Sequence, residues 1–217
     1  GLTKMTQGSD ALMDFEEIMG GKKAFRRTFP LLERGIDDYL RKAYKGGYVY
    51  VNPANKGQEK GHGYVLDANS LFPSRMKLCK LPYGSPVYYT GKYKKNKILD
   101  LYVCHIRCGF TIKSEKLPTI QIKHTLSFQE NEYLVSSNGE IVDLFLTSVD
   151  YDLFMEHYNT YSLEYIDGYM FKSKIHKEFV EYVDKWGEVK IQASIENNAG
   201  LRMVAKLLMN SLYGKFG

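Results

Sequence analysis

The chain has 217 residues, of which 44% are hydrophobic, enough to bury the core of one large domain or two small ones. Lysine and arginine number 30 against 25 acidic residues, and the net charge of +5 permits a polyanionic partner without requiring one. No apolar run approaches the roughly 18 residues of a membrane span, so we expect no membrane contact.

Three cysteines are an odd, low number, which argues against a disulfide scaffold and for a reducing compartment. Cys104-His105-x-x-Cys108 offers an alternative, a zinc site. Its alternating surroundings favour a strand, however, and no second pair of ligands accompanies it. We therefore expect these residues to be structural.

The first elements are short helices. Residues 8–20 are predicted to be helical, capped by Ser9 or Asp10, with apolar residues recurring on one face. A second short helix is predicted at 35–43, before the turn Tyr44-Lys45-Gly46-Gly47. The two glycines allow a backbone to come very close to a ligand, although a plain turn is the alternative. The alternating residues 48–51 then predict a strand, and 52–63 a loop.

Tyr64-Val65-Leu66 is a short apolar run that predicts a buried strand ending at Asp67. A turn and a helix should follow, with Pro73 delaying the start of the helix. An aspartate in this position is most often a helix cap or a surface residue, and metal ligation is the less common alternative.

The middle of the chain changes to strand-like segments separated by turn sequences. We expect strands at 86–93, 100–112, 118–123 and 140–147. A helix capped by Asp150 should follow at 150–160, and then a strand at 161–171. Residues 174–192 and 199–213 predict two helices joined by a break at 194–198, which together form an αα-hairpin.

The last predicted helix has two distinct faces. At about 100° per residue, one side of 200–216 carries polar groups and the other can pack. The polar side comprises Arg202, Met203, Lys206, Asn210 and Tyr213; the apolar side comprises Leu201, Val204, Ala205, Leu208 and Leu212. Gly214 is a usual way to end such a helix. By periodicity alone, an ordinary amphipathic surface helix explains this pattern.

Two motifs give the pattern a functional interpretation. Asp67-x-Asn69-Ser70-Leu71-Phe72-Pro73 resembles the first palm motif of family B DNA polymerases. Lys206-x-x-x-Asn210-Ser211-x-Tyr213-Gly214 resembles their fingers-helix motif and follows in the expected order. The turn at 44–47 and segments 118–123 and 146–150 resemble the protein-primed branch of this family, found in phages and linear plasmids. The resemblance runs nearly end to end.

The resemblance implies an α+β fold, namely part of a polymerase palm with a mostly β insertion and a two-helix fingers hairpin. The implied domains are the end of the exonuclease domain or a linker at 1–43 and the start of the palm at 44–77. The terminal-protein-region insertion follows at 78–172, and the fingers helices at 173–217. We expect both ends to be cut from a longer protein, because the chain lacks an initiator methionine and stops a few residues after a predicted helix. The resemblance places the second catalytic carboxylate motif beyond Gly217 and the exonuclease carboxylates before Gly1. We therefore expect the fragment alone to be inactive.

The resemblance also implies residue roles in two-metal nucleotidyl transfer. Asp67 is the implied catalytic residue and, with the carbonyl of Ala68, a ligand of two Mg²⁺ or Mn²⁺ ions. The implied nucleotide-binding residues are Ser70, Leu71, Phe72, Arg202, Lys206, Asn210 and Tyr213. The implied DNA-binding residues are Tyr44, Gly46, Gly47, Lys123 and Gly214. Phe72 replaces the family's usual tyrosine, so the ring that excludes a ribose hydroxyl is kept and its own hydroxyl is lost.

The expected partners are a DNA template-primer, a dNTP and a terminal protein that supplies the priming hydroxyl. We expect a monomer that acts in the cytoplasm of a bacterial host. Two other functions remain open. One is a non-catalytic nucleic-acid or protein binding module on the same fold, in which Asp67 is structural. The other is a nucleotide-binding enzyme of a different class, because palm-like scaffolds are widely reused.

Overall fold

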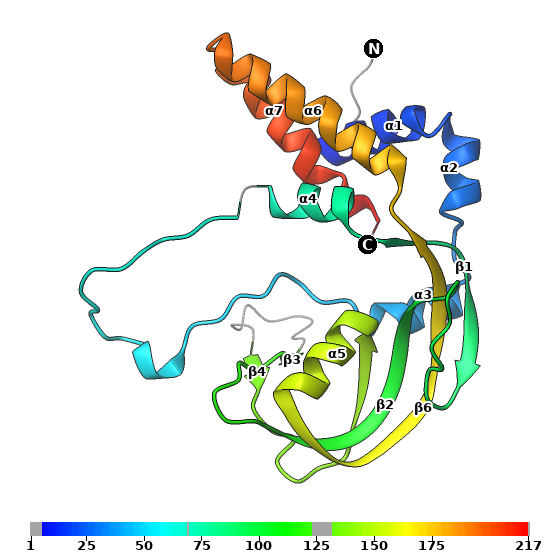
Figure 1. Ribbon diagram of the computed structural model, residues 1–217, viewed down its shortest axis with the longest axis vertical. Coiled ribbons are helices and arrows are strands. Elements are labelled where there is room, and N and C mark those ends of the chain that lie inside the picture. Colours follow the sequence, from blue (N-terminus) through cyan, green and yellow to red (C-terminus); the bar gives the residue numbers. More distant parts are fainter. Residues whose placement is uncertain (1–5, 69, 123–131, 217) are drawn as a thin grey trace. The chain divides into compact units, whose positions relative to one another are not determined.

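The computed structural model describes residues 6–68, 70–122 and 132–216. It shows an α+β fold of two compact units, which we describe separately (Figure 1). The first unit takes its residues from Gly1–Leu31, Leu66–Ser85 and Lys172–Gly217. The second unit takes them from Leu32–Val65 and Pro86–Phe171. The expected insertion at 78–172 thus lies almost entirely in the second unit, while the domain boundaries themselves stay a prediction.

The second unit is built on a strongly curled sheet (Figure 1). The strand order is β1-β6-β2-β5, and β2 runs antiparallel to both β5 and β6. The bounds are β1 Leu81–Thr90, β2 Leu101–Ile112, β5 Val142–Thr147 and β6 Tyr158–Lys174. A separate antiparallel pair joins β3 Ile120–Ile122 to β4 Glu132–Leu134. The sequence predicted the four longer strands and β3, but not β4.

One face of this sheet is covered by α5, Ser148–His157, and forms the core of the second unit. Cys104 and Cys108 are buried in that core, whereas His105 lies on the other face of β2 and contacts Asp143. Burial raises the pKa of the Cys104 thiol to about 12 and that of Cys108 to about 11, so both thiols are neutral near pH 7. Because the two cysteines and His105 lie on opposite faces of β2, they do not converge on one zinc ion.

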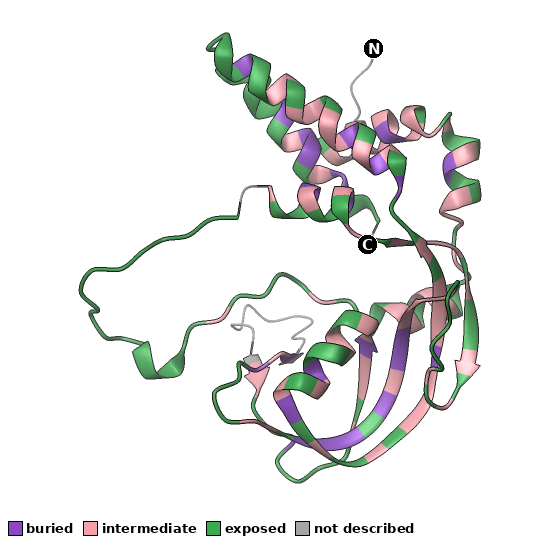
Figure 2. Ribbon diagram, viewed as in Figure 1, coloured by how far each residue is buried: buried purple, intermediate pink, exposed green. Residues whose placement is uncertain are grey.

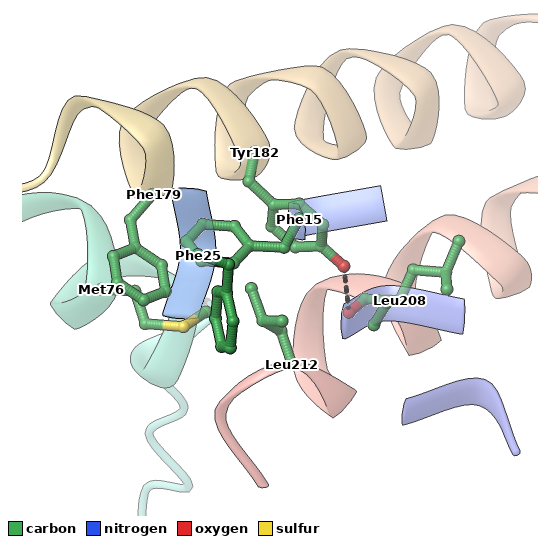
Figure 3. Packing of buried hydrophobic residues seen from close by; sticks show 8 residues of the cluster. Phe15, Phe25, Met76, Phe179, Tyr182, Leu208 and Leu212 are labelled. Carbon is green, nitrogen blue, oxygen red and sulfur yellow. Dashed lines mark hydrogen bonds between the residues drawn. The ribbon is translucent and has the colours of Figure 1, made fainter. Parts of the chain in front are cut away.

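The first unit is helical, and its core lies between α1, α2, α4, α6 and α7 (Figures 2 and 3). The bounds are α1 Gln7–Ile18, α2 Lys22–Thr28, α4 Leu71–Leu78, α6 Lys177–Ile195 and α7 Ala199–Ser211. Helices α6 and α7 pack against each other as the predicted αα-hairpin (Figure 1). Tyr182 joins them, because its buried hydroxyl donates to the carbonyl of Leu208 at 2.9 Å (Figure 3).

The helix caps differ from the sequence expectation. Thr6, not Ser9 or Asp10, caps α1, and Thr147, not Asp150, caps α5. In both cases the capping hydroxyl accepts from the backbone N–H three residues later, as an N-cap requires. The predicted helix at 35–43 is α3, Arg34–Arg41. Sequence propensity predicted these helices and misjudged where each one begins.

The ends of two other helices also differ. Pro73 lies inside α4 rather than delaying it, because a proline in the first turn removes no intrahelical hydrogen bond. Helix α7 ends at Ser211, and Gly214 falls in the following 3₁₀ turn, η2, Tyr213–Lys215. The break between α6 and α7 begins two residues later than predicted, at Glu196.

Two predicted strands do not form. Residues 48–51 have no regular secondary structure, and 52–63 contain only the 3₁₀ turn η1, Pro53–Asn55. Tyr64, Val65 and Leu66 are at least 92% exposed instead of forming a buried strand. A strand needs a hydrogen-bonded neighbour, and none of the described strands pairs with either segment.

Candidate functional site

The two motifs singled out in the sequence meet in the first unit. The aromatic rings of Phe72 and Tyr213 stack in parallel, with their centroids 4.2 Å apart and 5° between the ring planes. Phe72 lies in the first turn of α4 and Tyr213 just beyond the end of α7, and these helices pack against each other. Both side chains stay nearly half exposed. A contact between residues so distant in sequence places the motifs beside one accessible surface.

The polar face of α7 is arranged as the sequence predicted. Ala205, Leu208 and Leu212 are buried, which directs the opposite face to solvent. The exposed residues of that face are Arg202, Met203, Lys206, Asn210 and Tyr213. The side chains of Arg202, Lys206 and Asn210 make no hydrogen bond or ion pair with any part of the chain that the structure describes. They are available to an anionic ligand. Leu201 and Val204, expected to pack, are instead exposed.

The first motif begins in an exposed segment and turns sharply into α4. Asp67 and Ala68 are exposed, and Asn69 lies outside the described residues. Ser70 has a left-handed backbone, with φ 51° and ψ 50°, and gives α4 no side-chain cap. Such strain in a non-glycine residue is often found at binding sites. Leu71 and Phe72 follow, and each is 48% exposed.

Asp67 fits a hard divalent cation only in part. Its carboxylate and the carbonyl of Ala68 are exposed oxygen donors of the kind that Mg²⁺ and Mn²⁺ prefer. No group of three or more His, Cys, Asp or Glu able to hold a metal occurs within residues 6–68, 70–122 and 132–216. These two groups can therefore contribute oxygen ligands to a metal site.

The double-glycine turn lies in the second unit. A Cβ atom added at Gly46 or Gly47 would meet no atom within 4 Å, so neither glycine is required by packing inside the unit. Tyr44 is 57% exposed beside them. Gly214, in the first unit, is equally open, whereas Lys123 lies outside the described residues.

Two basic residues of the second unit make contacts within that unit. The Lys113 ammonium donates to the carbonyl oxygens of Met155 and Glu156, each at 2.9 Å. Lys116 pairs with the Glu156 carboxylate at 2.6 Å. Both lysines could have been read from sequence as phosphate contacts, but the structure assigns them to bracing the end of α5.

Sequence reasoning missed the contacts that hold the double-glycine turn. Lys45 pairs with Asp150, and Tyr48 and Val49 contact the segment before β3 and Tyr133 in β4. No periodic or local signal indicates these pairs, because they join residues 70 to 105 positions apart. Four of these residues, Lys45, Tyr48, Tyr133 and Asp150, also line a cavity of about 350 Å³ in the second unit.

Comparison with known proteins matches residues 2–217 to the family of organellar and viral type B DNA polymerases. The DNA polymerase of Bacillus phage phi29 is 44% identical over 216 residues, covering 100% of this chain and 36% of that protein. The DNA polymerase of Streptococcus phage Cp-1 is 34% identical over 222 residues, covering 99% and 38%. A probable DNA polymerase of Neurospora intermedia is 31% identical over 192 residues, covering 87% and 19%. The chain thus spans little more than a third of its phage relatives.

Solved structures agree with the sequence comparison. A crystal structure of phi29 DNA polymerase superposes with a TM-score of 0.93 at 44% identity, covering 99% of this chain and 37% of that one. The phi29 polymerase complexed with primer-template DNA and incoming nucleotide superposes with a TM-score of 0.90 at 44% identity, covering 100% and 37%. The expected α+β fold is therefore confirmed. The chain belongs to the organellar and viral type B DNA polymerases.

Proposed function

We propose that this chain forms the nucleotide-binding part of a DNA-directed DNA polymerase that replicates DNA from a protein primer. The observation that carries the proposal is the stack of Phe72 on Tyr213, which brings the palm and fingers motifs to one surface. The phi29 DNA polymerase, which matches this chain over its whole length, has been solved in complex with primer-template DNA and incoming nucleotide. This supports the same ligands for the present chain.

The polar face of α7 binds the triphosphate in this proposal. Lys206 and Arg202 lie on one side of the helix and form no ion pair with a described residue, so a polyphosphate can contact both cations without breaking a described pair. Asn210 and Tyr213, one and two turns further on, lie against the incoming nucleotide or the nascent base pair. Ser70 and Leu71 line the approach at the strained turn.

In this proposal Phe72 selects deoxyribonucleotides over ribonucleotides. Its ring stacks under the sugar and excludes a 2′-hydroxyl by its bulk, and no phenolic hydroxyl takes part because phenylalanine has none. The stack with Tyr213 covers only one face of the Phe72 ring and leaves the side chain nearly half exposed, so a sugar can reach the ring without breaking the stack.

Asp67 and the carbonyl of Ala68 hold divalent metal, Mg²⁺ or Mn²⁺, in this proposal. Two such ions, when bound, stabilise the attacking and leaving oxygens of the phosphoryl transfer. This chain supplies one exposed carboxylate to that site, and the rest of the polymerase supplies the others. We therefore propose that the 217-residue chain alone does not synthesise DNA.

The remaining assignments concern partners and context. Tyr44, Gly46, Gly47, Lys123 and Gly214 contact DNA. In chain order, the proposed domains are the end of the exonuclease domain or a linker at 1–43, the start of the palm at 44–77, the insertion at 78–172 and the fingers at 173–217. The insertion binds the terminal protein. No described helix is long and apolar enough to cross a membrane. We propose a monomer that acts in the cytoplasm of a bacterial host.

Lys206→Ala tests the nucleotide site. In the polymerase that contains this chain, we expect the KM for dNTP to rise about 10- to 100-fold, because a charged hydrogen bond to phosphate is lost. Steady-state primer extension at varied dNTP concentration measures this effect. Lys95→Ala is the matched control, since Lys95 is an exposed lysine of the other unit without a described side-chain contact. An equal KM in both variants would contradict the assignment.

Gly47→Ala tests the DNA contact at the double-glycine turn. The added methyl group has free space inside the unit, so we expect the melting temperature to stay unchanged. It would block close approach of a DNA backbone, so affinity for primer-template DNA should fall several-fold. Gly57→Ala is not a suitable control because Gly57 has a φ of 73°, whereas Gly61→Ala offers equally open space in the neighbouring loop. Unchanged DNA affinity in Gly47→Ala would exclude the contact.

A further inference from the structure

Residues 44–51, which we call the strap, contain the double-glycine turn and have little hydrogen bonding of their own. No backbone–backbone hydrogen bond between described residues involves 46–51, and the segment belongs to no helix or strand. Such a segment should be mobile unless side chains fix it. Gly46 and Gly47 in particular have no side chain with which to anchor themselves.

The contacts of the strap with the insertion include an ion pair, two hydrogen bonds and the packing of the Tyr48 and Tyr50 rings against Tyr133. The Lys45 ammonium lies 3.4 Å from Oδ1 of Asp150 in the first turn of α5. The Tyr48 hydroxyl donates to the carbonyl of Pro118 at 3.0 Å, and the backbone N–H of Val49 donates to the Tyr133 hydroxyl at 3.1 Å. The strap is therefore fixed by α5, by the segment before β3 and by β4. All of these residues lie in the second unit.

The ion pair involves the residue that directly precedes the two glycines. Both side chains are mostly buried, with 21% of Lys45 and 29% of Asp150 exposed, so solvent screens them less than a surface pair. The other carboxylate oxygen of Asp150 accepts from the Thr147 hydroxyl at 2.7 Å. Because the cap of α5 fixes one oxygen, the other is presented to Lys45 in a defined direction.

We infer that Lys45 is a positioning residue: its ion pair with Asp150 holds Gly46 and Gly47 in the conformation that contacts DNA. The inference rests on the proposed function, since it assumes that the glycines meet DNA. It also implies that DNA contact by the strap depends on the insertion, because the anchoring carboxylate belongs to α5. Lys45 itself need not touch a phosphate.

The change in net charge distinguishes a positioning role of Lys45 from direct contact between Lys45 and DNA. Asp150→Asn makes the protein more positive by one charge, so electrostatics alone predicts tighter DNA binding. If Lys45 is a positioning residue, Asp150→Asn should instead lower the affinity for DNA by about three- to tenfold. Lys45→Met should lower it by a similar factor. The double variant Lys45→Met/Asp150→Asn should bind DNA no more weakly than either single variant, because both changes break the same ion pair. Lys45→Arg should keep the wild-type affinity for DNA, because arginine can also pair with Asp150. Asp152→Asn, an exposed neighbour on α5 without a described contact, is the matched charge control and should not weaken binding.

Hydrogen exchange in the full-length polymerase supplies a readout that does not depend on DNA. We expect the amides of 44–51 to exchange faster in Lys45→Met and Asp150→Asn than in wild type or Asp152→Asn. Unchanged exchange in both variants would overturn the positioning role. Faster exchange with unchanged DNA affinity would instead overturn the proposed DNA contact of the glycines. If Lys45→Met weakens binding and lowers its salt dependence while Asp150→Asn does not weaken it, Lys45 contacts phosphate directly and the inference fails.

Discussion

Asp67→Asn is expected to reduce DNA synthesis by the polymerase that contains this chain by at least about a thousandfold. The amide keeps the size of the carboxylate and removes its charge, and the charge stabilisation that a bound metal provides is worth several kcal/mol. Primer extension at saturating dNTP measures the loss. DNA affinity should stay near that of wild type, because Asp67 is not among the residues assigned to DNA. Glu59→Gln is the matched control, since Glu59 is also an exposed carboxylate and shortly precedes the first motif in the sequence.

The same assay tests the isolated chain. If the chain holds only part of the metal site, as we propose, the 217 residues alone should give no extension product with Mg²⁺ or Mn²⁺. Extension by the chain that Asp67→Asn abolishes would show that its own residues complete the site, and our proposal of an incomplete site would be wrong. Activity in the longer Asp67→Asn polymerase close to that of Glu59→Gln would remove Asp67 from the catalytic role.

Helix periodicity explains why the fingers side of the site could be predicted. Buried and exposed positions in α7 follow from a 3.6-residue repeat, so Lys206 and Asn210 could be placed on one exposed face before the structure was seen. The stack of Phe72 on Tyr213 could not be derived from periodicity. The resemblance of the two motifs assigned both residues to the nucleotide site, but it did not predict that their rings stack on each other.

The errors share a physical cause. Residues 48–51 and 64–66 have strand-like composition, but a strand forms only against a partner that sequence alone does not identify. The Lys45–Asp150 pair was missed for a related reason, since it depends on how the chain returns to α5 after more than a hundred residues. The caps at Thr6 and Thr147 were missed because several nearby Ser, Thr and Asp residues compete for one position.

Phe15→Ala is expected to lower the free energy of unfolding of the first unit by about 3–5 kcal/mol. Phe15 is completely buried, and its ring stacks on Phe179 at 4.4 Å and meets Phe25 and Tyr182 edge to face (Figure 3). Alanine would remove these contacts and leave a cavity among α1, α2 and α6. Urea unfolding followed by circular dichroism measures the change. Leu31→Ala, a truncation at a residue 79% exposed, should cost little.

The consequence for function distinguishes this variant from one at the site. Helix α1 packs directly on α7, and Leu212 at the end of α7 belongs to the same core as Phe15. Loosening that core should displace Tyr213 from Phe72 and raise the KM for dNTP as well as lower stability. Lys206→Ala should raise KM without changing stability, because its side chain is exposed and unpaired. If Phe15→Ala unfolds at lower urea yet keeps a wild-type KM, the aromatic core does not position the nucleotide face of α7.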